Sequence, residues 1–260
     1  MIGQVFGDAF DLYRKHLKIV AIPYIMFLIL AFIIFLVALI FFLHATGYTQ
    51  STQNTLHVYV MLVTLYAIYS LFAGPLLMGT SISMVKQYYA DGSVSLMAGF
   101  REAKSKLASM VGASLVLTVV SIALFVVAAL PLILGYVAKA YSSIEWILII
   151  TYILSAIAGA ILIIITYQTY PAIIFEDRHA IDAVKRGIAV GRIKALTILA
   201  VILVDSLIAV PLAIVSVLAS MTSAMLGAVA VFVLFFLVYL PYTLLLPGTF
   251  YKTYVKRQSK

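Results

Sequence analysis

The sequence predicts an all-α fold, a polytopic bundle of six transmembrane helices that forms a single integral membrane domain over residues 1–260. Of these residues 65% are hydrophobic and 10% are charged, whereas an average soluble domain is about half apolar and about a quarter charged. The excess apolar surface must therefore face lipid. The apolar residues gather in six runs, and the basic residues gather between them.

Each of the six runs is long and apolar enough to cross the hydrocarbon core, which takes about 20 residues of helix. Irregular segments are excluded from lipid because each unpaired backbone group there costs several kcal/mol. The first run, which contains YIMFLILAFIIFLVALIFFL, is too long for a signal peptide, and we expect the protein to retain it. The predicted spans are Ile19–Leu43, Val58–Val85, Leu107–Val137, Ile147–Ile173, Ala195–Ala219 and Ala224–Tyr251.

The Lys and Arg residues are distributed asymmetrically among the predicted loops. Sixteen of the 17 precede the first, third or fifth span or follow the sixth, and only Lys139 lies on the other side. An excess of Lys and Arg marks the cytoplasmic side of a membrane. We therefore predict a multi-pass protein of the plasma membrane with both termini in the cytoplasm.

The inner segments before the first, third and fifth spans share a helical pattern. In each, apolar residues recur on one face, and an acid precedes a base by four residues, which is the favourable order for a helical pair. Each segment is therefore predicted to be an amphipathic helix at the inner membrane surface, its apolar side toward lipid. The pairs are Asp11–Lys15, Glu102–Lys106 and Asp182–Arg186, and the faces are Phe6, Phe10, Tyr13 and Leu17; Leu96, Phe100, Ala103 and Leu107; and Ile181, Val184 and Ile188.

A surface helix followed by a transmembrane hairpin makes a unit that fits the chain three times, at residues 1–90, 91–175 and 176–260. The second and sixth spans support a repeat because GTSISMVKQYY and GTFYKTYVK both run from Gly-Thr into a basic, tyrosine-rich tail. A second interpretation stays open, since any six-helix protein has three inner segments and charged inner segments are commonly helical.

The net charge of +8 indicates which partners to expect. Lys and Arg at the inner surface attract anionic lipid headgroups by about 1 kcal/mol each. Nucleic acid is not expected, because no basic domain projects from the membrane to hold it. The expected partners are membrane lipids and either a second copy of the chain or another membrane protein. The predicted lipid contacts are Lys15, Lys18, Arg101, Lys104, Lys106, Lys185, Arg186, Arg192 and Lys194.

Asp205 is the one acid or base that lies deep inside a predicted span. A charge at mid-bilayer costs at least about 2.5–3.5 kcal/mol, so such a residue is by default a candidate for function. Asp205 could bind a proton or substrate beside helices interrupted by proline, as transporters do. It could equally be a protonated acid that donates a hydrogen bond to a neighbouring helix. Thr118 is predicted to lie at the same depth, and Tyr167 and Gln168 somewhat nearer the cytoplasm, as further candidates to bind a substrate or proton.

The sequence offers little for catalysis. The chain has no cysteine, which excludes disulfides, thiol nucleophiles and cysteine metal ligands. Glu176, Asp177 and His179 could form a metal or acid–base cluster, but metal sites usually need three or four ligands and no second histidine lies nearby. A helix start is the favoured interpretation. We expect no catalytic residue, no cofactor and no metal.

Two stretches carry a resemblance to a known family: FGDAFDLYRKHLKIV at the N-terminus, and YPAIIFEDRHAIDAVKRGIAVGR from Tyr170 to Arg192. They resemble the membrane domain attached to some prokaryotic glycerophosphoryl diester phosphodiesterases and related uncharacterised six-helix membrane proteins of bacteria and archaea. Pro171, Glu176 and residues 183–186 match, whereas the family's usual serine is Gly187 here. The resemblance implies the fold. It implies no phosphodiesterase activity, because that active site lies in a separate soluble barrel that this sequence does not contain.

Together these observations predict a non-enzymatic integral membrane protein that serves as a lipid-associated scaffold or accessory subunit. Two alternatives stay open. The first is a small transporter or permease that uses Asp205, and the second is a lipid-processing membrane enzyme.

Overall fold

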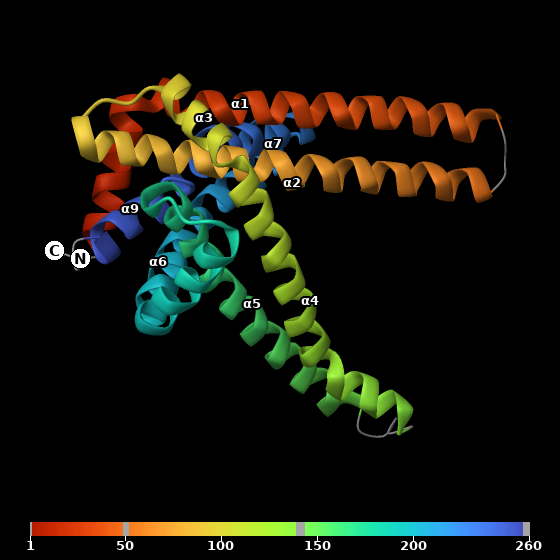
Figure 1. The fold of residues 1–260 in the computed structure, drawn as a ribbon. Helices are drawn as coiled ribbons and strands as arrows, with labels where there is room; N and C mark the ends of the chain where they lie inside the picture. The colour runs from red at the N-terminus through yellow and green to blue at the C-terminus, as the bar shows by residue number, and fades with distance from the viewer. Residues whose placement is uncertain (1, 49–51, 139–143, 257–260) are drawn as a thin grey trace. The chain divides into compact units, whose positions relative to one another are not determined.

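The structure is a computed structural model that describes the backbone of residues 2–48, 52–138 and 144–256. Side chains are described over the same ranges except at 18, 24, 26–28, 30–32, 34–48, 52–63, 65–68, 70, 224, 226, 228, 232, 236, 237 and 256. Every regular element in these ranges is a helix, which confirms the all-α prediction (Figure 1). The elements are α1 (Ile2–Tyr48), α2 (Thr52–Asp91), α3 (Leu96–Ser105), α4 (Leu107–Val137), α5 (Ile144–Glu176), α6 (Ala180–Thr222), α7 (Ala224–Val231), the π-helix η2 (Phe232–Tyr239), α8 (Leu240–Thr243), α9 (Leu246–Phe250) and the π-helix η3 (Tyr251–Lys256).

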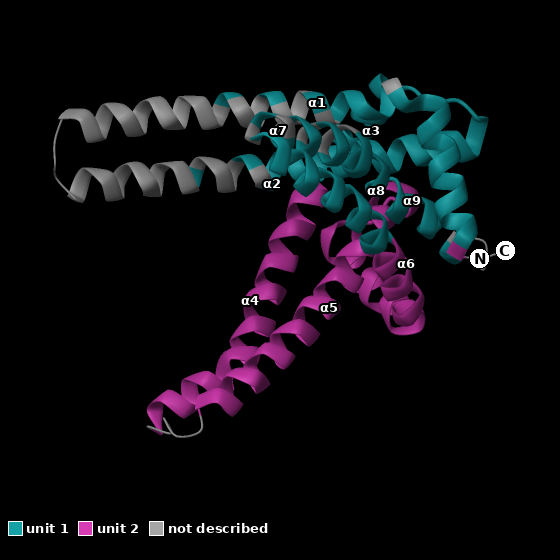
Figure 2. Ribbon diagram, turned by 180° about the vertical axis from the view of Figure 1, so that it is seen from behind, with its two compact units in different colours: residues 1, 3–107, 205–260 teal, residues 2, 108–204 magenta. Residues whose placement is uncertain are grey.

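The chain forms two compact units (Figure 2). The first unit contains Gly3–Leu107 and Asp205–Lys260, and the second contains Ala108–Val204. The predicted threefold repeat is a statement about sequence pattern and stays a prediction.

Helix α1 is kinked at His16, where the backbone leaves the helical region with φ −124° and ψ 26°. The segment before the kink is the first predicted surface helix, and the segment after it carries the first predicted span. Phe10 is 54% exposed and Leu17 is 44% exposed, but the rest of the predicted apolar face does not share this exposure. A different face of the same helix packs against the rest of the first unit, and Tyr13 of the predicted face is buried together with it. The buried residues are Val5, Ala9, Leu12 and Tyr13.

The C-terminal part of α2 is enclosed by other helices of the first unit. Residues 79–85 are all buried, and α3 and α9 pack against α2. The contact with α3 is close, because a Cβ on Gly99 would lie 3.3 Å from the carbonyl oxygen of Thr80. Ser95 caps α3 by accepting a hydrogen bond from the N–H of Ala98 at 3.4 Å. The second predicted surface helix is therefore present as a separate, capped helix.

Glu102 joins α3 to α2 through its carboxylate. The Ser83 hydroxyl donates to it, and the Nζ atoms of Lys86 and Lys106 lie 2.6 Å and 3.4 Å away. The predicted Glu102–Lys106 pair is therefore confirmed. Burial raises the pKa of Glu102, but the lysines and Ser83 lower it more, so the pKa lies below its ordinary value of 4.5.

Replacing Glu102 by glutamine is expected to destabilise the first unit by about 1–2 kcal/mol, because it removes the charge that pairs with two partly buried lysines. A lowered carboxyl pKa stabilises the fold above pH 4.5, and this contribution is lost as the pH falls through the lowered value. Thermal unfolding in detergent should therefore separate Glu102→Gln from the wild type at pH 7 and bring the two together in acid.

Glu145→Gln is the matched control, because Glu145 is exposed in the first turn of α5. The role assigned to the Glu102 ion pairs would be contradicted if both substitutions lowered the unfolding midpoint equally. It would also be contradicted if the difference between Glu102→Gln and the wild type were the same at pH 7 and in acid.

In the second unit α4 and α5 form an antiparallel hairpin (Figure 1). The hydroxyl groups of Ser114 and Tyr170 are 2.7 Å apart near one end. Near the other end, a Cβ on Gly135 would lie 2.5 Å from a methyl carbon of Ile147. These two contacts, one at each end, hold the helices together along their length.

Helix α6 runs without a break from Ala180 to Thr222. The third predicted surface helix and the fifth predicted span are therefore one helix, because no proline or turn separates them before Pro211. The first part of α6 approaches α5 through two glycines. A Cβ on Gly187 would lie 2.7 Å from the carbonyl oxygen of Ile165, and one on Gly191 would lie 2.8 Å from a methyl carbon of Ile164.

Four helical segments of the described chain are long and apolar enough to cross a membrane. They bury few of their apolar side chains, and Val119 is 67% exposed while Leu203 is 63% exposed. Apolar surface of this extent needs lipid or a partner to cover it. The segments are Leu107–Val137, Ile144–Glu176, Ala180–Thr222 and Val229–Val255. The first three contain the third, fourth and fifth predicted spans, and the last overlaps the sixth.

The two remaining predicted spans, Ile19–Leu43 and Val58–Val85, fall within α1 and α2. Most of their side chains lie outside the described residues, so the count of six spans stays a prediction.

The last predicted span, Ala224–Tyr251, is a succession of short helices where a single helix was expected. A π-helix occupies Phe232–Tyr239, and η3 is a second one. Pro241 and Pro247 stand in the first turns of α8 and α9. Proline has no N–H to donate, so the helix is interrupted and restarts at each of them.

Candidate functional site

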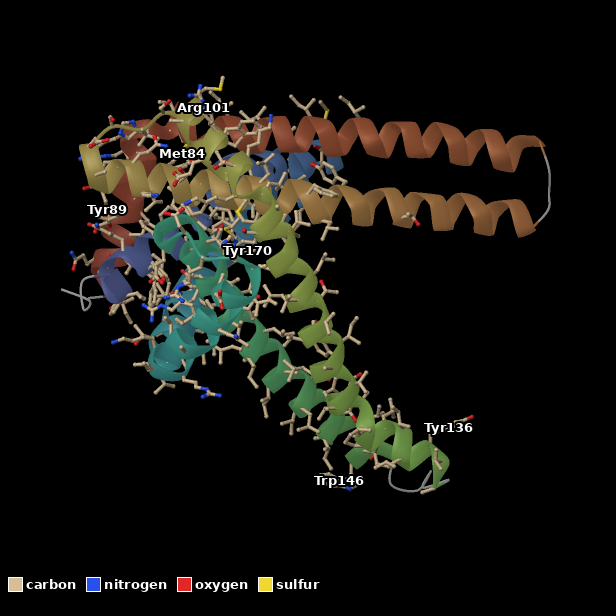
Figure 3. All side chains as sticks on the ribbon, viewed as in Figure 1. Met84, Tyr89, Arg101, Tyr136, Trp146 and Tyr170 are labelled. Atoms are coloured by element: carbon tan, nitrogen blue, oxygen red, sulfur yellow. The ribbon has the colours of Figure 1, made fainter. Side chains whose placement is uncertain are left out.

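The exposed face of α3 combines basic and apolar residues. Met97 is 67% exposed and Phe100 is 41% exposed, and Arg101 and Lys104 are also exposed. These four residues, at positions i, i+3, i+4 and i+7, lie on one face of the helix, and we call them the α3 stripe. The opposite face packs on α2, where Met84 is buried (Figure 3).

The predicted lipid contacts differ in how free they are to bind a headgroup. Arg101, Lys104 and Arg192 are exposed and have no ion-pair partner among the described residues. Lys185 is paired with Asp182 at 3.9 Å, but 74% of its side chain is exposed. These residues remain accessible to an anionic group.

The other predicted lipid contacts are less available or lie elsewhere. Lys106 is held by Glu102, and Arg186 is held by Glu176 at 3.1 Å rather than by the predicted Asp182. Lys194 is half-buried. Lys15 is exposed and approaches Tyr88, and the side chain of Lys18 lies outside those described.

Glu176, Asp177 and His179 form the turn between α5 and α6. The Glu176 carboxylate accepts hydrogen bonds from Arg178 and Arg186. Asp177 has φ 55°, the left-handed conformation that commonly ends a helix. The carbonyl of His179 accepts the N–H of Ala183 at 2.8 Å at the start of α6. In the described part of the chain, no three His, Asp or Glu residues gather to hold a metal ion, and the arrangement fits the helix-start interpretation.

Asp205 lies in α6 within the first unit. The Tyr239 hydroxyl, at the end of the π-helix η2, donates to the backbone carbonyl of Asp205 at 3.1 Å. The Oδ1 atom of Asp205 is buried and has no hydrogen-bond partner among the described residues. The predicted neighbour Thr118 lies in the second unit, is exposed, and donates to the Ser114 carbonyl of its own helix at 2.8 Å.

Tyr167 and Gln168 lie together on α5 in the second unit. The Gln168 side chain is fully buried, and neither atom of its amide has a hydrogen-bond partner in the described part of the structure. The Tyr167 hydroxyl is buried as well. Gln168 is therefore in the protein interior and Tyr167 is half-buried, while Thr118 is exposed.

A polar cluster at the C-terminal end of α2 was not predicted from the sequence. It brings together Asp8 and Lys15 of α1, Tyr88 and Tyr89 of α2, and Lys252 of η3. Tyr89 is labelled in Figure 3. One sequence feature could have indicated this cluster: the basic, tyrosine-rich tail that follows both the second and the sixth span.

Exposed aromatic residues mark the far end of the α4–α5 hairpin. Tyr136 is 72% exposed and Trp146 is 69% exposed, and both project from the hairpin near its tip (Figure 3). Tyrosine and tryptophan concentrate where a membrane meets water. Their position is that expected for one edge of a membrane-embedded hairpin.

These features define a class: an all-helical protein with several helices that are long and apolar enough to span a membrane, as in multi-pass membrane proteins. Comparison of the chain with protein-family models, with curated proteins and with solved structures found no match.

Proposed function

We propose that the protein is a non-enzymatic, multi-pass protein of the plasma membrane that binds anionic lipid headgroups at its cytoplasmic face and serves as a scaffold or accessory subunit. The α3 stripe carries this proposal. A helix that buries Gly99 and Ala103 in the protein while it exposes Phe100 beside Arg101 and Lys104 suits the boundary between headgroups and acyl chains.

Two other segments repeat this combination of exposed residues. Phe10, Arg14 and Leu17 are exposed at i, i+4 and i+7 in the first segment of α1. Ile181 and Lys185 are exposed at i and i+4 at the start of α6. The resemblance to the membrane domain of prokaryotic phosphodiesterases supports the same kind of role, since the active site of those enzymes lies in a separate soluble barrel.

The state of the carboxylates supports a non-enzymatic role. A lipid-processing site would need an acid or base that is available to the substrate. Glu102 and Glu176 instead accept hydrogen bonds from basic side chains of their own units, and those bonds serve the fold.

The proposal is tested by measuring which lipids accompany the protein in polymer-bounded membrane discs. We expect phosphatidylglycerol to be enriched over phosphatidylethanolamine relative to the bulk membrane. Arg101→Gln with Lys104→Gln should weaken the interaction about fivefold per charge removed, which corresponds to ~1 kcal/mol each. The charge-preserving pair Arg101→Lys with Lys104→Arg is the matched control, and equal enrichment in all three proteins would refute lipid binding by the stripe.

The π-helix beside Asp205 favours a second candidate function, a small transporter. π-Helical turns inside α-helices occur frequently at functional sites, and discontinuous helices line the binding sites of many transporters. Here a buried carboxylate oxygen lies on a helix that is bonded to an interrupted helix. Proton flux into proteoliposomes that contain pyranine tests the idea: equal rates for the wild type and Asp205→Asn would remove it.

A further inference from the structure

Two lysines lie beside two adjacent tyrosines at the C-terminal end of α2. The Nζ atom of Lys15 lies 3.5 Å from the Tyr88 hydroxyl oxygen and 6.0 Å from the centre of the Tyr88 ring. The Nζ atom of Lys252 lies 5.8 Å from the centre of the Tyr89 ring. The two ring centres are 5.9 Å apart. Cationic groups from α1 and η3 therefore flank one pair of aromatic rings on α2, and we call these four residues the Lys–Tyr cluster.

The acid nearest to this cluster is already engaged. The Tyr89 hydroxyl donates to Oδ2 of Asp8 at 2.6 Å. Burial and this hydrogen bond raise the pKa of Tyr89, so the phenol keeps its proton and stays a donor. Among the described residues neither Lys15 nor Lys252 has an ion-pair partner. Two lysines are consequently held beside one pair of rings, with the Asp8 carboxylate bonded to Tyr89 and in ion-pair contact with neither of them.

The kink in α1 shapes this place. Successive residues of an α-helix point in directions about 100° apart and do not face a common neighbour. Lys15 and His16 nevertheless both contact Tyr88, with the His16 ring centre 6.1 Å from the ring centre of Tyr88. The non-helical backbone at His16 makes this convergence feasible. The cluster thus gains a further N–H donor, since imidazole carries one in either neutral tautomer.

We propose that the Lys–Tyr cluster binds the phosphate group of an anionic membrane lipid. A phosphate diester offers several acceptor oxygens and one negative charge. These match the ammonium groups of Lys15 and Lys252, the His16 imidazole and the Tyr88 hydroxyl, all of which can donate hydrogen bonds. Lysine is a common phosphate ligand as a point charge, and tyrosines concentrate at the level of the headgroups. This inference rests on the proposed lipid association but uses residues outside the α3 stripe.

Native mass spectrometry of the delipidated, detergent-solubilised full chain tests the site. The probes are phosphatidylglycerol, phosphatidylcholine and inorganic phosphate, each titrated separately. We expect one phosphatidylglycerol molecule to remain bound at collision energies that remove the others. Lys15→Gln with Lys252→Gln should weaken this adduct by about tenfold or more, while Lys15→Arg with Lys252→Arg should retain it. Tyr88→Phe, which keeps the ring and removes the hydroxyl, should weaken it less.

The α3-stripe variant Arg101→Gln with Lys104→Gln separates the two lipid proposals. Retention of the single adduct in that variant, together with its loss in the lysine-to-glutamine pair, supports a discrete site whether or not the stripe enriches lipid. Equal adducts in the wild type and the lysine-to-glutamine pair would overturn the site. So would saturation by inorganic phosphate without any preference for phosphatidylglycerol over phosphatidylcholine. If the glutamine pair does not fold, loss of the adduct in the arginine pair would overturn the role of the two charges.

Discussion

Replacing Gly187 by alanine is expected to lower the thermal unfolding midpoint by roughly 2–12 °C, the effect of overpacking by about 1–3 kcal/mol in a chain of this length. The added Cβ would lie 2.7 Å from the carbonyl oxygen of Ile165 and 2.7 Å from Oγ1 of Thr169. The carbonyl oxygen belongs to the backbone of α5 and cannot rotate away. Thr169 also donates its hydroxyl to that carbonyl. The α5 and α6 helices must therefore separate, which disrupts the core of the second unit.

Gly159→Ala is the matched control, because no atom lies within 4 Å of the place where its Cβ would be. Alanine in an open helical position stabilises by about 0.5–1 kcal/mol over glycine, so the two substitutions should have opposite signs. Unfolding of the purified variants in detergent, followed by circular dichroism, measures both. If Gly187→Ala raises the midpoint as Gly159→Ala does, the close contact between α5 and α6 is not present in the protein.

Gly187→Ser extends the same test to the family resemblance. Serine is the usual residue at this place in the phosphodiesterase membrane domains, and it carries the same Cβ as alanine. We expect it to be as destabilising as alanine here. An equal loss for serine and alanine would show that this position needs glycine because α5 and α6 approach each other closely there.

Long apolar runs could be read from the sequence because lipid demands them. The predicted third span, Leu107–Val137, has the bounds of α4, since polar residues stand at both of its ends. Interruptions within an apolar run carry no such signal. The π-helix η2 within the last span was missed because its residues are as apolar as those of any other span. Pro241 indicates a break in this span, but a proline does not show the kind of helix on either side.

Hydrophobicity could not tell a side chain that faces protein from one that faces lipid. Phe10 and Leu12 are both apolar and close in sequence, yet Phe10 is 54% exposed and Leu12 is 1% exposed. The basic residues posed the same difficulty. Arg186 was a predicted lipid contact, but its partner Glu176 is ten residues away and lies at the end of another helix. Such a partner follows from the fold and not from a helical spacing rule.

The Lys–Tyr cluster lay beyond sequence reasoning for a related reason. Lys15 and Lys252 are separated by nearly the whole chain. Only the packing of α9 on α2, with η3 following it, brings the second lysine to Tyr89. The tyrosine-rich tail of the second span is visible in the sequence, but the pairing of its tyrosines with particular lysines depends on tertiary structure.

Single-cysteine labelling of intact cells is expected to show that the basic segments lie inside the cell, with each position either fully reactive or fully protected. Cysteines at Ser93 and His179 should resist a membrane-impermeant maleimide in intact cells, whereas cysteines at Ala138 and Glu145 should react fully. All four positions are exposed, and the chain has no native cysteine, so each signal comes from one site. The physical reason is the cost of translocating Lys and Arg, which are confined to one side of the predicted spans with the exception of Lys139.

Permeabilised cells provide the control, since all four cysteines should then react equally. Reaction of Ser93→Cys and His179→Cys from outside, with Ala138→Cys and Glu145→Cys protected, would invert the protein in the membrane. The α3 stripe and the Lys–Tyr cluster would then face the outer leaflet, away from the surface potential of the cytoplasmic leaflet that gives their charges an advantage. Different reactivity of Ser93→Cys and His179→Cys would instead require an odd number of crossings between α2 and α6. The lipid proposals therefore depend on this labelling pattern more directly than on any contact within the fold.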